Sequence, residues 1–511
     1  MRRTRTKGEA RDERPAGIDP LVASIATAAR EAGGRAFLVG GFVRDLMARR
    51  LAGEAGPPPG REFDLEVYGL APEVLVRTLS RFGEVKLVGE SFAVYKVVPP
   101  ATAAGTASDL ADRGAAGSVP PGAPPPVIDV SLPRRDTKVA PGHRGFQVQG
   151  DPRLSFEEAT RRRDFRINAM LHDPLTGETI DPWGGSDDLK SRRIRAVDPR
   201  TFVEDSLRVL RGMQLAARLE FKIDDATVEL CRGIVLKDLP AERIWGEMEK
   251  LLLRAARPSL GLDWARRLGI VDQLFPELKA LQGCPQEPEW HPEGDVWTHT
   301  LMAIDRAKQE IAGLPKEKAL AVLLAVLCHD FGKPATTALV DGRIRSYEHE
   351  AAGVAPTRAF LDRLRLHTLG GYDLREQVVA LVAHHLTPSH YFKSRDTVGA
   401  GAFRRLARSL EPELLYRVSR ADCLGRTGNF PTEAQEWFIA KVRALGVEEK
   451  PPRPLLMGRH LLEMGLEPGP LVGRIARAVY EMQLDGRVTD LEGARRAALA
   501  LLDEEAGRRP A

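Results

Sequence analysis

The chain has 511 residues, of which 43% are hydrophobic and 29% are charged, as in globular proteins and unlike disordered or membrane-embedded chains. This length exceeds that of one ordinary hydrophobic core and predicts several domains. The formal net charge of +4 is too small to indicate a nucleic-acid partner by itself, so that partner must be inferred from local arginine clusters such as residues 161–163 and 192–195.

The N-terminus and the cysteines indicate a cytoplasmic protein. Residues 1–14 are charged and lack the apolar segment of a signal peptide. No stretch approaches 18 uninterrupted apolar residues, so we expect neither a membrane span nor a membrane partner. Four widely separated cysteines without CxxC spacing argue against a disulfide framework and a zinc ribbon, and they fit a reducing compartment: Cys231, Cys284, Cys328 and Cys423.

After a solvated tail at 1–18, residues 19–150 alternate short strands with short helices. Helices are expected after Gly41 and after Ala71, where Pro72 suits a first helical position. The predicted strands are 36–39, 62–68, 84–88, 93–97 and 127–130. Two segments rich in small residues and proline, 53–60 and 99–126, are predicted to be insertions between these elements.

From residue 151 onward the periodicity is mainly helical. We expect a helical neck and body over 151–282, a second helical block over 283–430, and a helical tail region over 431–511. The predicted fold class is therefore α+β, with a mixed sheet and helices first and all-α domains after it. Helices with clear three- and four-residue spacing are expected at 206–217, 227–235, 241–254 and 260–268.

Residues 62–67 place three acids on one side of a predicted strand. Because side chains alternate along a strand, Glu62, Asp64 and Glu66 share one face. Adjacent carboxylates repel one another unless cations lie among them, and acids that bridge two divalent ions are a common device for nucleotidyl transfer. Mg²⁺ prefers carboxylate and phosphate oxygens. The alternative interpretation is a half-buried strand with a solvated acidic face.

A double glycine precedes this strand. Gly40 and Gly41 follow an apolar strand and open a helix, so backbone amides there can approach a phosphate at the helix N-terminus. A double glycine alone is a weak signal. It becomes specific when Val-Arg-Asp and an acidic strand follow it, as they do here.

Residues 38–45 with Glu62-x-Asp64 resemble the first motif of the tRNA nucleotidyltransferase and bacterial poly(A) polymerase family. The resemblance continues through four further motifs in the family's order and spans about residues 36–255. These motifs are Arg-Arg-Asp-Phe-x-x-Asn-Ala at 162–169, Ile-Asp-Pro-Trp-Gly-Gly at 180–185, Glu-Asp-x-Leu-Arg-x-x-Arg at 204–211 and Pro-Ala-Glu-Arg-Ile-Trp at 240–245.

The resemblance implies catalytic roles for three acids. Glu62 and Asp64 would hold Mg²⁺, and Asp129 would assist deprotonation of the RNA 3′-hydroxyl; alternatively, Asp129 is an exposed strand acid without a role. The family usually has Asp-x-Asp, so Glu62 departs from the pattern, and Glu66 could take part instead. The remaining motif residues are implied to bind the nucleotide, although a salt-bridge ladder is the alternative for 204–211: Gly40, Gly41, Arg44, Arg163, Asp164, Asn168, Asp205, Arg208 and Arg211.

The basic, glycine-rich segment 134–145 corresponds to the loop that the resemblance links to switching from C to A addition. Its presence favours incorporation of A. The alternative is an ordinary charged surface loop.

A second constellation follows, because eight of the 11 histidines fall between residues 290 and 430. The apolar run 322–328 predicts a helix that ends in His329-Asp330, and ligands from other helices can complete a mixed nitrogen and oxygen metal site there. This block resembles the HD phosphohydrolase domain. The resemblance implies a divalent metal of unspecified identity on His299, His329, Asp330 and Asp422, with a second ion on His349, His384 and His385, and hydrolysis of phosphomonoesters or 2′,3′-cyclic phosphodiesters.

We therefore expect an enzyme that adds C and A to the 3′ end of tRNA from CTP and ATP. A poly(A) polymerase or an A-only adding enzyme is the close alternative, since both share these motifs, but the HD block favours the tRNA enzyme. A more distant alternative is an HD phosphohydrolase whose N-terminal half only binds RNA; the intact acidic strand argues against it. The oligomeric state is not determined by the sequence.

Overall fold

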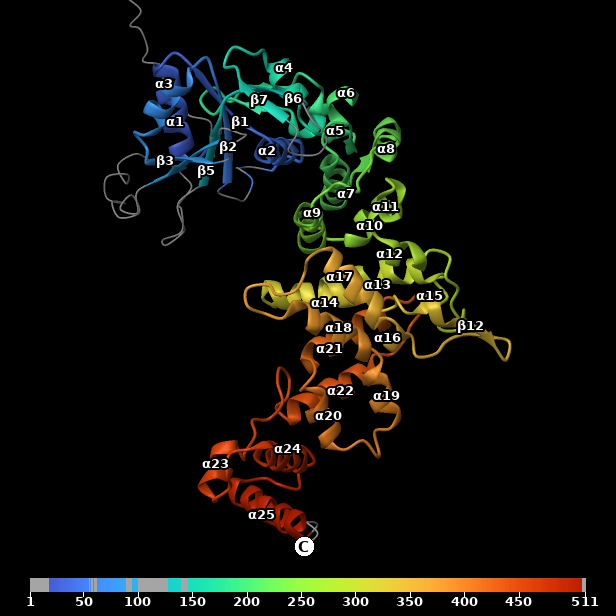
Figure 1. Ribbon diagram of the computed structural model, residues 1–511. Helices are drawn as coiled ribbons and strands as arrows, with labels where there is room; N and C mark the ends of the chain where they lie inside the picture. The colour runs from blue at the N-terminus through green and yellow to red at the C-terminus, as the bar shows by residue number, and fades with distance from the viewer. Residues whose placement is uncertain are drawn as a thin grey trace, which may run out of the picture. The chain divides into compact units, whose positions relative to one another are not determined.

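A computed structural model describes residues 18–54, 56, 58, 62–88, 94–99, 127–138 and 146–507 (Figure 1). The predicted tail apart from Ile18, nearly all of the 99–126 insertion and residues 139–145 of the basic loop lie outside the described residues. The chain divides into two compact units, Met1–Leu239 and Pro240–Ala511. The finer boundaries near residues 150, 282 and 430 stay predictions.

The first unit is built on a mixed seven-stranded sheet with the strand order β3-β4-β5-β2-β1-β8-β9. β2 and β5 are parallel, and the other neighbours are antiparallel. The strands are β1 (Arg35–Val39), β2 (Glu62–Tyr68), β3 (Glu84–Val88), β4 (Val94–Val98), β5 (Val127–Ser131), β8 (Leu171–His172) and β9 (Thr179–Ile180). A separate hairpin pairs β6 (Arg134–Lys138) with β7 (Phe146–Gly150).

Three helices accompany the sheet: α1 (Pro20–Glu31), α2 (Gly41–Leu51) and α3 (Pro72–Leu79). α1 begins where the Asp19 side chain accepts the Leu21 amide at 2.9 Å. Its buried Val22, Ile25 and Ala29 lie at three- and four-residue spacing, and the helix packs against β1 and α3 (Figure 1). Because β1 and β2 are antiparallel, with Leu38 opposite Leu65, the turn between β1 and α2 lies beside the start of β2 at Glu62.

The rest of the first unit consists of short helices and one small parallel pair. α4 leads into the Arg162–Asn168 segment, and α7 is the longest helix of this part. The elements are α4 (Phe156–Arg161), the 3₁₀ helix η2 (Arg166–Asn168), α5 (Gly185–Lys190), β10 (Arg193–Ile194), α6 (Pro199–Phe202), α7 (Leu207–Leu219), β11 (Lys222–Ile223) and α8 (Asp225–Arg232).

Between residues 240 and 507, the second unit is helical except for one hairpin. Its helices up to the predicted tail region are α9 (Ala241–Arg254), α10 (Pro258–Arg267), α11 (Ile270–Leu274), α12 (Pro276–Leu281), α13 (Val296–Glu310), α14 (Lys316–Cys328), α15 (Lys333–Thr336), α16 (His349–Ala352), α17 (Val354–Arg363), α18 (Leu374–His384), α19 (Thr387–Lys393), α20 (Ala400–Leu406) and α21 (Pro412–Leu424). α22 (Glu433–Ala444), α23 (Gly458–Glu463), α24 (Pro470–Leu484) and α25 (Leu491–Gly507) follow, and the hairpin joins β12 (Thr337–Val340) to β13 (Arg343–Ser346).

α14 is the core helix of this unit. Every residue from Ala319 to Cys328 is buried, and the helix contacts α13, α18 and α21. A helix that is apolar all round needs partners on all sides. Residues 316–336 are long and apolar enough to cross a membrane, but 83% of their most apolar window is buried inside the protein. Their hydrophobicity is therefore explained by the core.

The predicted α+β class is confirmed, and the five strands β1 to β5 each lie within one residue of the predicted bounds. From residue 151 onward the described chain is mainly helical, as predicted, but it also contains three short strand pairs that the sequence did not indicate. The pairs β8–β9, β10–β11 and β12–β13 were missed because strands of two to four residues are too short to show a period of two.

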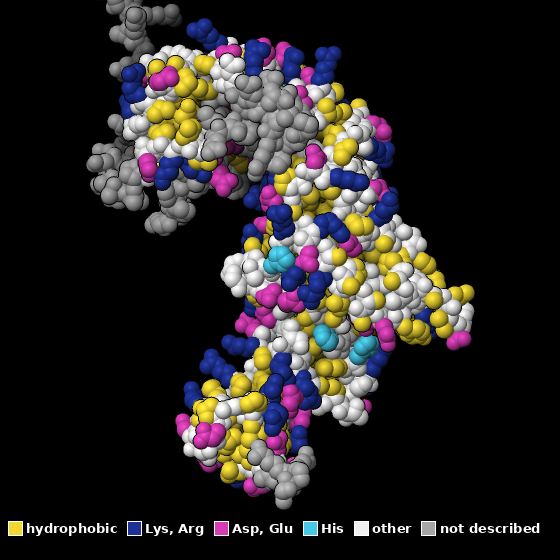
Figure 2. Space-filling view, in the orientation of Figure 1, with side chains coloured by type: hydrophobic (Ala, Val, Ile, Leu, Met, Phe, Trp, Pro, Cys, Tyr) yellow, Lys and Arg dark blue, Asp and Glu magenta, His cyan; other side chains and the backbone are white. Residues whose placement is uncertain are grey.

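Figure 2 shows Lys and Arg side chains interspersed with Asp and Glu over the visible face of the molecule, rather than one uniformly basic surface. This mixture agrees with the small net charge of +4.

Candidate active sites

The acidic side chains of the sheet converge through strand register. Asp64 on β2 lies directly opposite Asp129 on the parallel strand β5, and Glu62 precedes Asp64 on the same face. Glu62 and Asp64 are exposed, whereas Asp129 is half-buried with Lys96 Nζ 3.8 Å from its Oδ1. Although Asp64 is exposed as a whole residue, neighbouring protein atoms partly desolvate its carboxyl, and Asp129 and Glu62 repel its charge. Both effects raise the pKa of Asp64, and Arg163 opposes the shift.

A glycine turn lies beside these acids. Gly40 has a φ of +72° and caps the N-terminus of α2, a conformation that a side chain would strain. A Cβ built on Gly40 would lie 3.5 Å from Asp64 Oδ2 and 3.8 Å from an Arg163 terminal nitrogen. The amides that open α2, the Asp64 carboxylate and the Arg163 guanidinium therefore share one corner, which suits a phosphate with a bound cation.

Glu66 differs from its two neighbours on the predicted acidic face. Its side chain is 0% exposed, with Arg162 and Arg163 nitrogens 3.2 and 3.3 Å from its Oε2. The Tyr68 hydroxyl donates to its Oε1 at 2.6 Å. β2 is exposed at Glu62 and Asp64 but buried at Glu66. The alternation of side chains therefore predicted the face of the strand on which Glu66 lies, but it did not predict that Glu66 is buried.

Four of the nine predicted nucleotide-binding residues form one hydrogen-bonded chain. Buried Arg44 donates to Asn168 Oδ1 at 3.0 Å, and the Asn168 amide donates to Asp164 Oδ1 at 3.1 Å. Arg211 reaches Asp164 Oδ2 through two nitrogens, each at 2.6 Å. The chain joins α2, the 162–169 motif and α7, so three motifs that are far apart in sequence meet in one place. Because Arg44 is buried, it contributes to this network through its bond to Asn168.

Arg208 and Asp205 stand at the start of α7. The Arg208 guanidinium donates to the backbone carbonyls of Thr201 and Arg162. Asp205 precedes the helix, and its Oδ1 accepts the Leu207 amide at 3.2 Å. The pKa of Arg208 is lowered by burial, although Asp164 and Asp205 oppose this. These bonds fix the orientation of the guanidinium fork, whose five N–H donors exceed the two used here.

In the second unit, helix ends assemble the metal-ligand candidates. α14 ends at Cys328 and presents His329 and Asp330, while His299 lies on α13 and Asp422 on α21. Gly332 allows the segment with His349 to approach, because a Cβ on Gly332 would lie 2.0 Å from the His349 carbonyl oxygen. All four predicted ligands are buried.

Four histidines of the cluster have their Nδ1 atoms fixed by an oxygen acceptor. His329, His349 and His385 face the carbonyls of Val326, Ser346 and Val382 at 2.7, 2.8 and 2.8 Å, and His299 faces Glu293 Oε1 at 2.9 Å. An acceptor requires the proton on Nδ1, so the lone pair of each neutral ring lies on Nε2. This arrangement is typical of histidines that ligate a metal.

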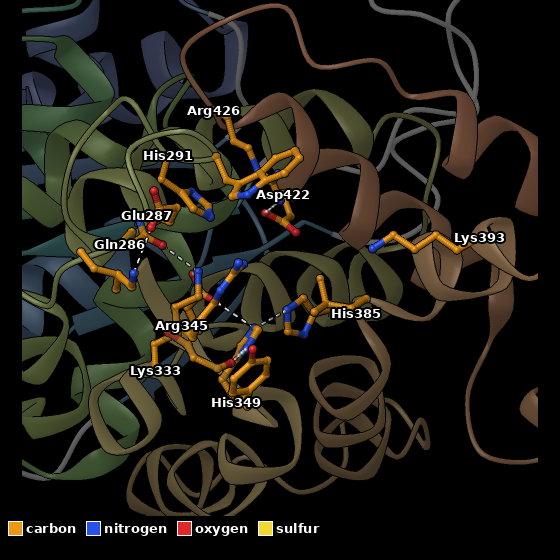
Figure 3. A pocket seen from close by; sticks show the side chains of 16 residues that line it. Gln286, Glu287, His291, Lys333, Arg345, His349, His385, Lys393, Asp422 and Arg426 are labelled. Carbon is orange, nitrogen blue, oxygen red and sulfur yellow. Dashed lines mark hydrogen bonds and ion pairs between the residues drawn. The ribbon is translucent and has the colours of Figure 1, made fainter. Parts of the chain in front are cut away.

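The Nε2 atoms and carboxylates form two adjoining groups, His299–His329–Asp422 and Asp330–His349–His385, within each of which the ligand atoms lie within 4.8 Å of one another. His349 Nε2 and His385 Nε2 are only 3.3 Å apart (Figure 3). Two lone pairs at this distance repel each other unless a cation lies between them. His329 Nε2 and both oxygens of Asp330 are also buried without a regular hydrogen bond. These residues fit divalent metal ions.

Burial and neighbouring charges determine the protonation states of the side chains in the cluster. Burial lowers the pKa of His385 to about 3, and the neighbouring His349 and His329 contribute to the shift. Burial raises the pKa of Asp422, but Arg426 and His299 outweigh it and leave the pKa well below its usual value. The carboxylates are therefore ionised and His385 is neutral at neutral pH, as metal ligation requires.

The cluster opens into a pocket of about 370 Å³. Asp330, Asp422, His349 and His385 line it, and His291, Lys393 and Arg426 stand around it in Figure 3. Lys333 Nζ lies 2.8 Å from Asp330 Oδ2, and an Arg426 nitrogen lies 3.5 Å from Asp422 Oδ1. Cations beside a metal site suit a substrate that carries a phosphate.

Sequence reasoning missed three of these residues and misplaced one. Lys333 and Arg426 follow Asp330 and Asp422 by three and four residues, a helical spacing that could have indicated them. Glu293 bridges His291 and His299, which no local pattern predicts. His384 belongs to neither ligand group, and its Nδ1 lies 3.4 Å from Thr387 Oγ1 instead.

Comparison with known families defines the class of the first unit. Residues 125–195 match the family described as the poly A polymerase head domain, and residues 220–282 match a probable RNA- and SrmB-binding site of polymerase A. The first match contains Asp129 and the whole 162–169 motif. Residues 125–195 are thus identified as part of a head domain of the poly(A) polymerase type.

Curated relatives extend this assignment over most of the chain. A multifunctional CCA protein of Halorhodospira halophila is 35% identical over 454 residues, which are 86% of this chain and 94% of the relative. The multifunctional CCA protein of Methylococcus capsulatus is 33% identical over 457 residues, 87% of this chain and 92% of the relative. The chain belongs to the family of multifunctional CCA proteins.

Solved structures share the fold at low sequence identity. The Bacillus stearothermophilus CCA-adding enzyme in complex with CTP has a TM-score of 0.60 at 20% identity, covering 96% of this chain and 100% of that one. A Thermotoga maritima CCA-adding enzyme complexed with tRNA has a TM-score of 0.54 at 20% identity, covering 95% and 96%. At this identity the likeness establishes the fold alone.

Proposed function

We propose that the protein adds C and A to the 3′ end of tRNA in the cytoplasm, using CTP and ATP. The observation that carries the proposal is the meeting of Asp64, Asp129 and Arg163 at the Gly40 turn, in a chain that belongs to the multifunctional CCA proteins. The crystallised CCA-adding enzymes with the same fold were captured with CTP, ATP or tRNA.

In this proposal the three carboxylates have different roles in an in-line transfer. Glu62 and Asp64 hold Mg²⁺, which supplies charge stabilisation for the triphosphate when bound. Asp129, opposite Asp64, accepts the proton of the tRNA 3′-hydroxyl as its oxygen attacks the α-phosphorus and pyrophosphate leaves. Glu62 replaces the family's usual aspartate and reaches one methylene farther from the strand.

Nucleotide selection is assigned to the residues around α7. Arg163 and the α2 amides face the phosphates, and Asp164 and Asn168 lie toward the ribose. Asp205 and Arg208 present an acceptor and a donor fork to the base edge, and Arg211 pairs with Asp164. Because two backbone carbonyls hold Arg208, its remaining donors are oriented before a base arrives.

A transfer assay tests this proposal. Purified protein is incubated with tRNA lacking CCA, with tRNA ending in CC, and with an unrelated RNA, and CTP and ATP are offered separately and together. We expect CC from CTP, a terminal A only on the CC form, and no extension of the unrelated RNA. Long A tails on any RNA would instead identify a poly(A) polymerase, and addition of A alone would identify an A-adding enzyme.

We also propose that the second unit is a metal-dependent phosphohydrolase. Four histidines with fixed Nδ1 atoms, two carboxylates and a pocket with several cations support this second activity. His299, His329, Asp330 and Asp422 would hold one divalent ion, and Asp330 with His349 and His385 a second. A bound metal supplies an activated water, while Lys333 and Arg426 face the phosphate.

Hydrolysis of 2′,3′-cyclic AMP and p-nitrophenyl phosphate tests the second activity. The chelated protein is reloaded with Mg²⁺, Mn²⁺, Ni²⁺, Co²⁺ or Zn²⁺ in turn. We expect hydrolysis to disappear on chelation and to return with at least one transition metal. Hydrolysis that is independent of every metal would contradict the assignment.

A further inference from the structure

Glu66 has an environment unlike that of the other acids on β2. Its carboxylate is fully buried, yet Oε2 faces two guanidinium groups and Oε1 accepts the Tyr68 hydroxyl. A buried charge is costly unless it is paired and hydrogen-bonded. Here three donors from Arg162, Arg163 and Tyr68 satisfy it, so the carboxylate has its partners within the protein.

Glu66 and Asp64 share Arg163. The two acids lie two residues apart on the same face of β2, and one Arg163 terminal nitrogen is 3.3 Å from Glu66 Oε2. The other terminal nitrogen of Arg163 is directed to the Gly40 corner, where Asp64 Oδ2 also lies. An arginine that one carboxylate holds from behind presents its remaining donors in a fixed direction.

Arg162, the second arginine that pairs with Glu66, also contacts helix α7. The Arg162 side chain pairs with Glu66 at 3.2 Å, and the Arg162 carbonyl accepts a bond from Arg208. The buried carboxylate therefore fixes the 162–163 segment, and this segment carries contacts to both the phosphate corner and the base-selecting helix.

We propose that Glu66 is a positioning residue for the incoming nucleotide: its buried carboxylate holds Arg163 at the Gly40 corner and, through Arg162, the Arg208 fork. This inference rests on the proposed nucleotidyl transfer. It differs from a metal-ligand role for Glu66, because a side chain with 0% exposure and three protein donors offers no open coordination position.

Steady-state transfer by Glu66→Gln tests the inference. The amide keeps the shape and removes the charge, so we expect KM for CTP and for ATP to rise about tenfold, the usual effect of losing a charged hydrogen bond. We expect kcat to stay within about threefold of the wild type. Tyr68→Phe is the matched control: it removes the third donor, leaves both arginine pairs, and should keep KM within about twofold.

A double-mutant cycle shows whether Glu66 acts through Arg163. If it does, Glu66→Gln in an Arg163→Ala background should change KM by less than about twofold. Additive effects, a wild-type KM in the single variant, or a raised Mg²⁺ requirement with unchanged KM would each overturn the inference. Failure of the wild-type protein to extend tRNA would instead overturn the proposed function.

Glu66→Asp keeps the test decisive if the glutamine variant does not fold. It retains the charge but withdraws the carboxylate by one methylene, so KM should rise at least about threefold while the melting temperature stays close to that of the wild type. An unchanged KM in this folded variant would overturn the inference. Circular dichroism and thermal unfolding of the same preparations verify that equal amounts of folded protein are compared.

Discussion

The two candidate active sites differ in how they hold their candidate metal ligands. On the sheet, Glu62 and Asp64 are exposed, and strand register alone brings Asp64 opposite Asp129. In the helical unit, His299, His329, Asp330 and Asp422 are buried at helix ends, and hydrogen bonds fix the rings from behind. Exposed carboxylates suit an ion that arrives with a nucleotide, whereas buried imidazoles suit a resident ion.

This difference predicts how each site responds to damage. The sheet site depends on a few charges at the surface of a stable scaffold, so losing one charge should remove chemistry and leave folding intact. The helical site is part of the core, so its variants should alter metal content and stability together.

The largest effect is expected for Asp64→Ala, which removes the carboxylate between Glu62 and Asp129. Transfer to tRNA should fall about 1,000-fold or more, because a metal-holding charge supplies several kcal/mol to the transition state. Hydrolysis of 2′,3′-cyclic AMP should not change. Asp187→Ala, at a side chain with 80% exposure, is the control and should retain transfer. Loss of both activities in Asp64→Ala would contradict the separation of the sites.

His329→Ala should produce the reverse pattern with a similar magnitude. The imidazole belongs to the first ligand group and faces Asp330 at 3.1 Å, so hydrolysis should fall about 1,000-fold while CCA addition persists. His367→Ala, at a side chain with 55% exposure, serves as the control. Metal analysis of both proteins should show depletion only in His329→Ala; full metal content there would remove His329 from the ligand set.

A smaller effect is expected for Glu293→Gln. The Glu293 carboxylate accepts from His299 and His291, and these bonds bring its pKa down to about 2 although burial raises it. The amide weakens the hold on the His299 ring, so metal affinity should fall roughly 10- to 100-fold. Metal titration followed by calorimetry measures this change, with Glu289→Gln at an exposed position as the control. Unaltered affinity would show that Glu293 has no part in orienting the ligand.

The smallest effect concerns acid stability of the first unit. Burial lowers the pKa of His172 to about 4, with a further contribution from Arg50. The unfolded histidine binds a proton at a higher pH than the folded one, so folding loses stability as the pH falls from about 7 to about 5, by about 2 kcal/mol. His172→Leu should reduce this pH slope in urea titrations, whereas His367→Leu should not. Equal slopes in the two variants would exclude His172 as the cause.

The sheet site was accessible to sequence reasoning because its residues lie in short ordered motifs. Alternation placed Glu62 and Asp64 on one face, and the structure brings Asp129 opposite Asp64. The burial of Glu66 was not predictable, since it depends on Arg162 and Arg163 from a segment about 100 residues away. His349 and His385 were noted from the sequence, but only tertiary packing separates His385 from its neighbour His384.

Gly332 shows that the assembly of candidate metal ligands can depend on a residue that has no side chain. Any side chain at this position would push against the carbonyl of His349, and the second ligand group would open even with every histidine and aspartate in place. A search for related chains that scores the candidate ligands alone would accept chains unable to assemble this cluster. Including this glycine among the defining positions would exclude them.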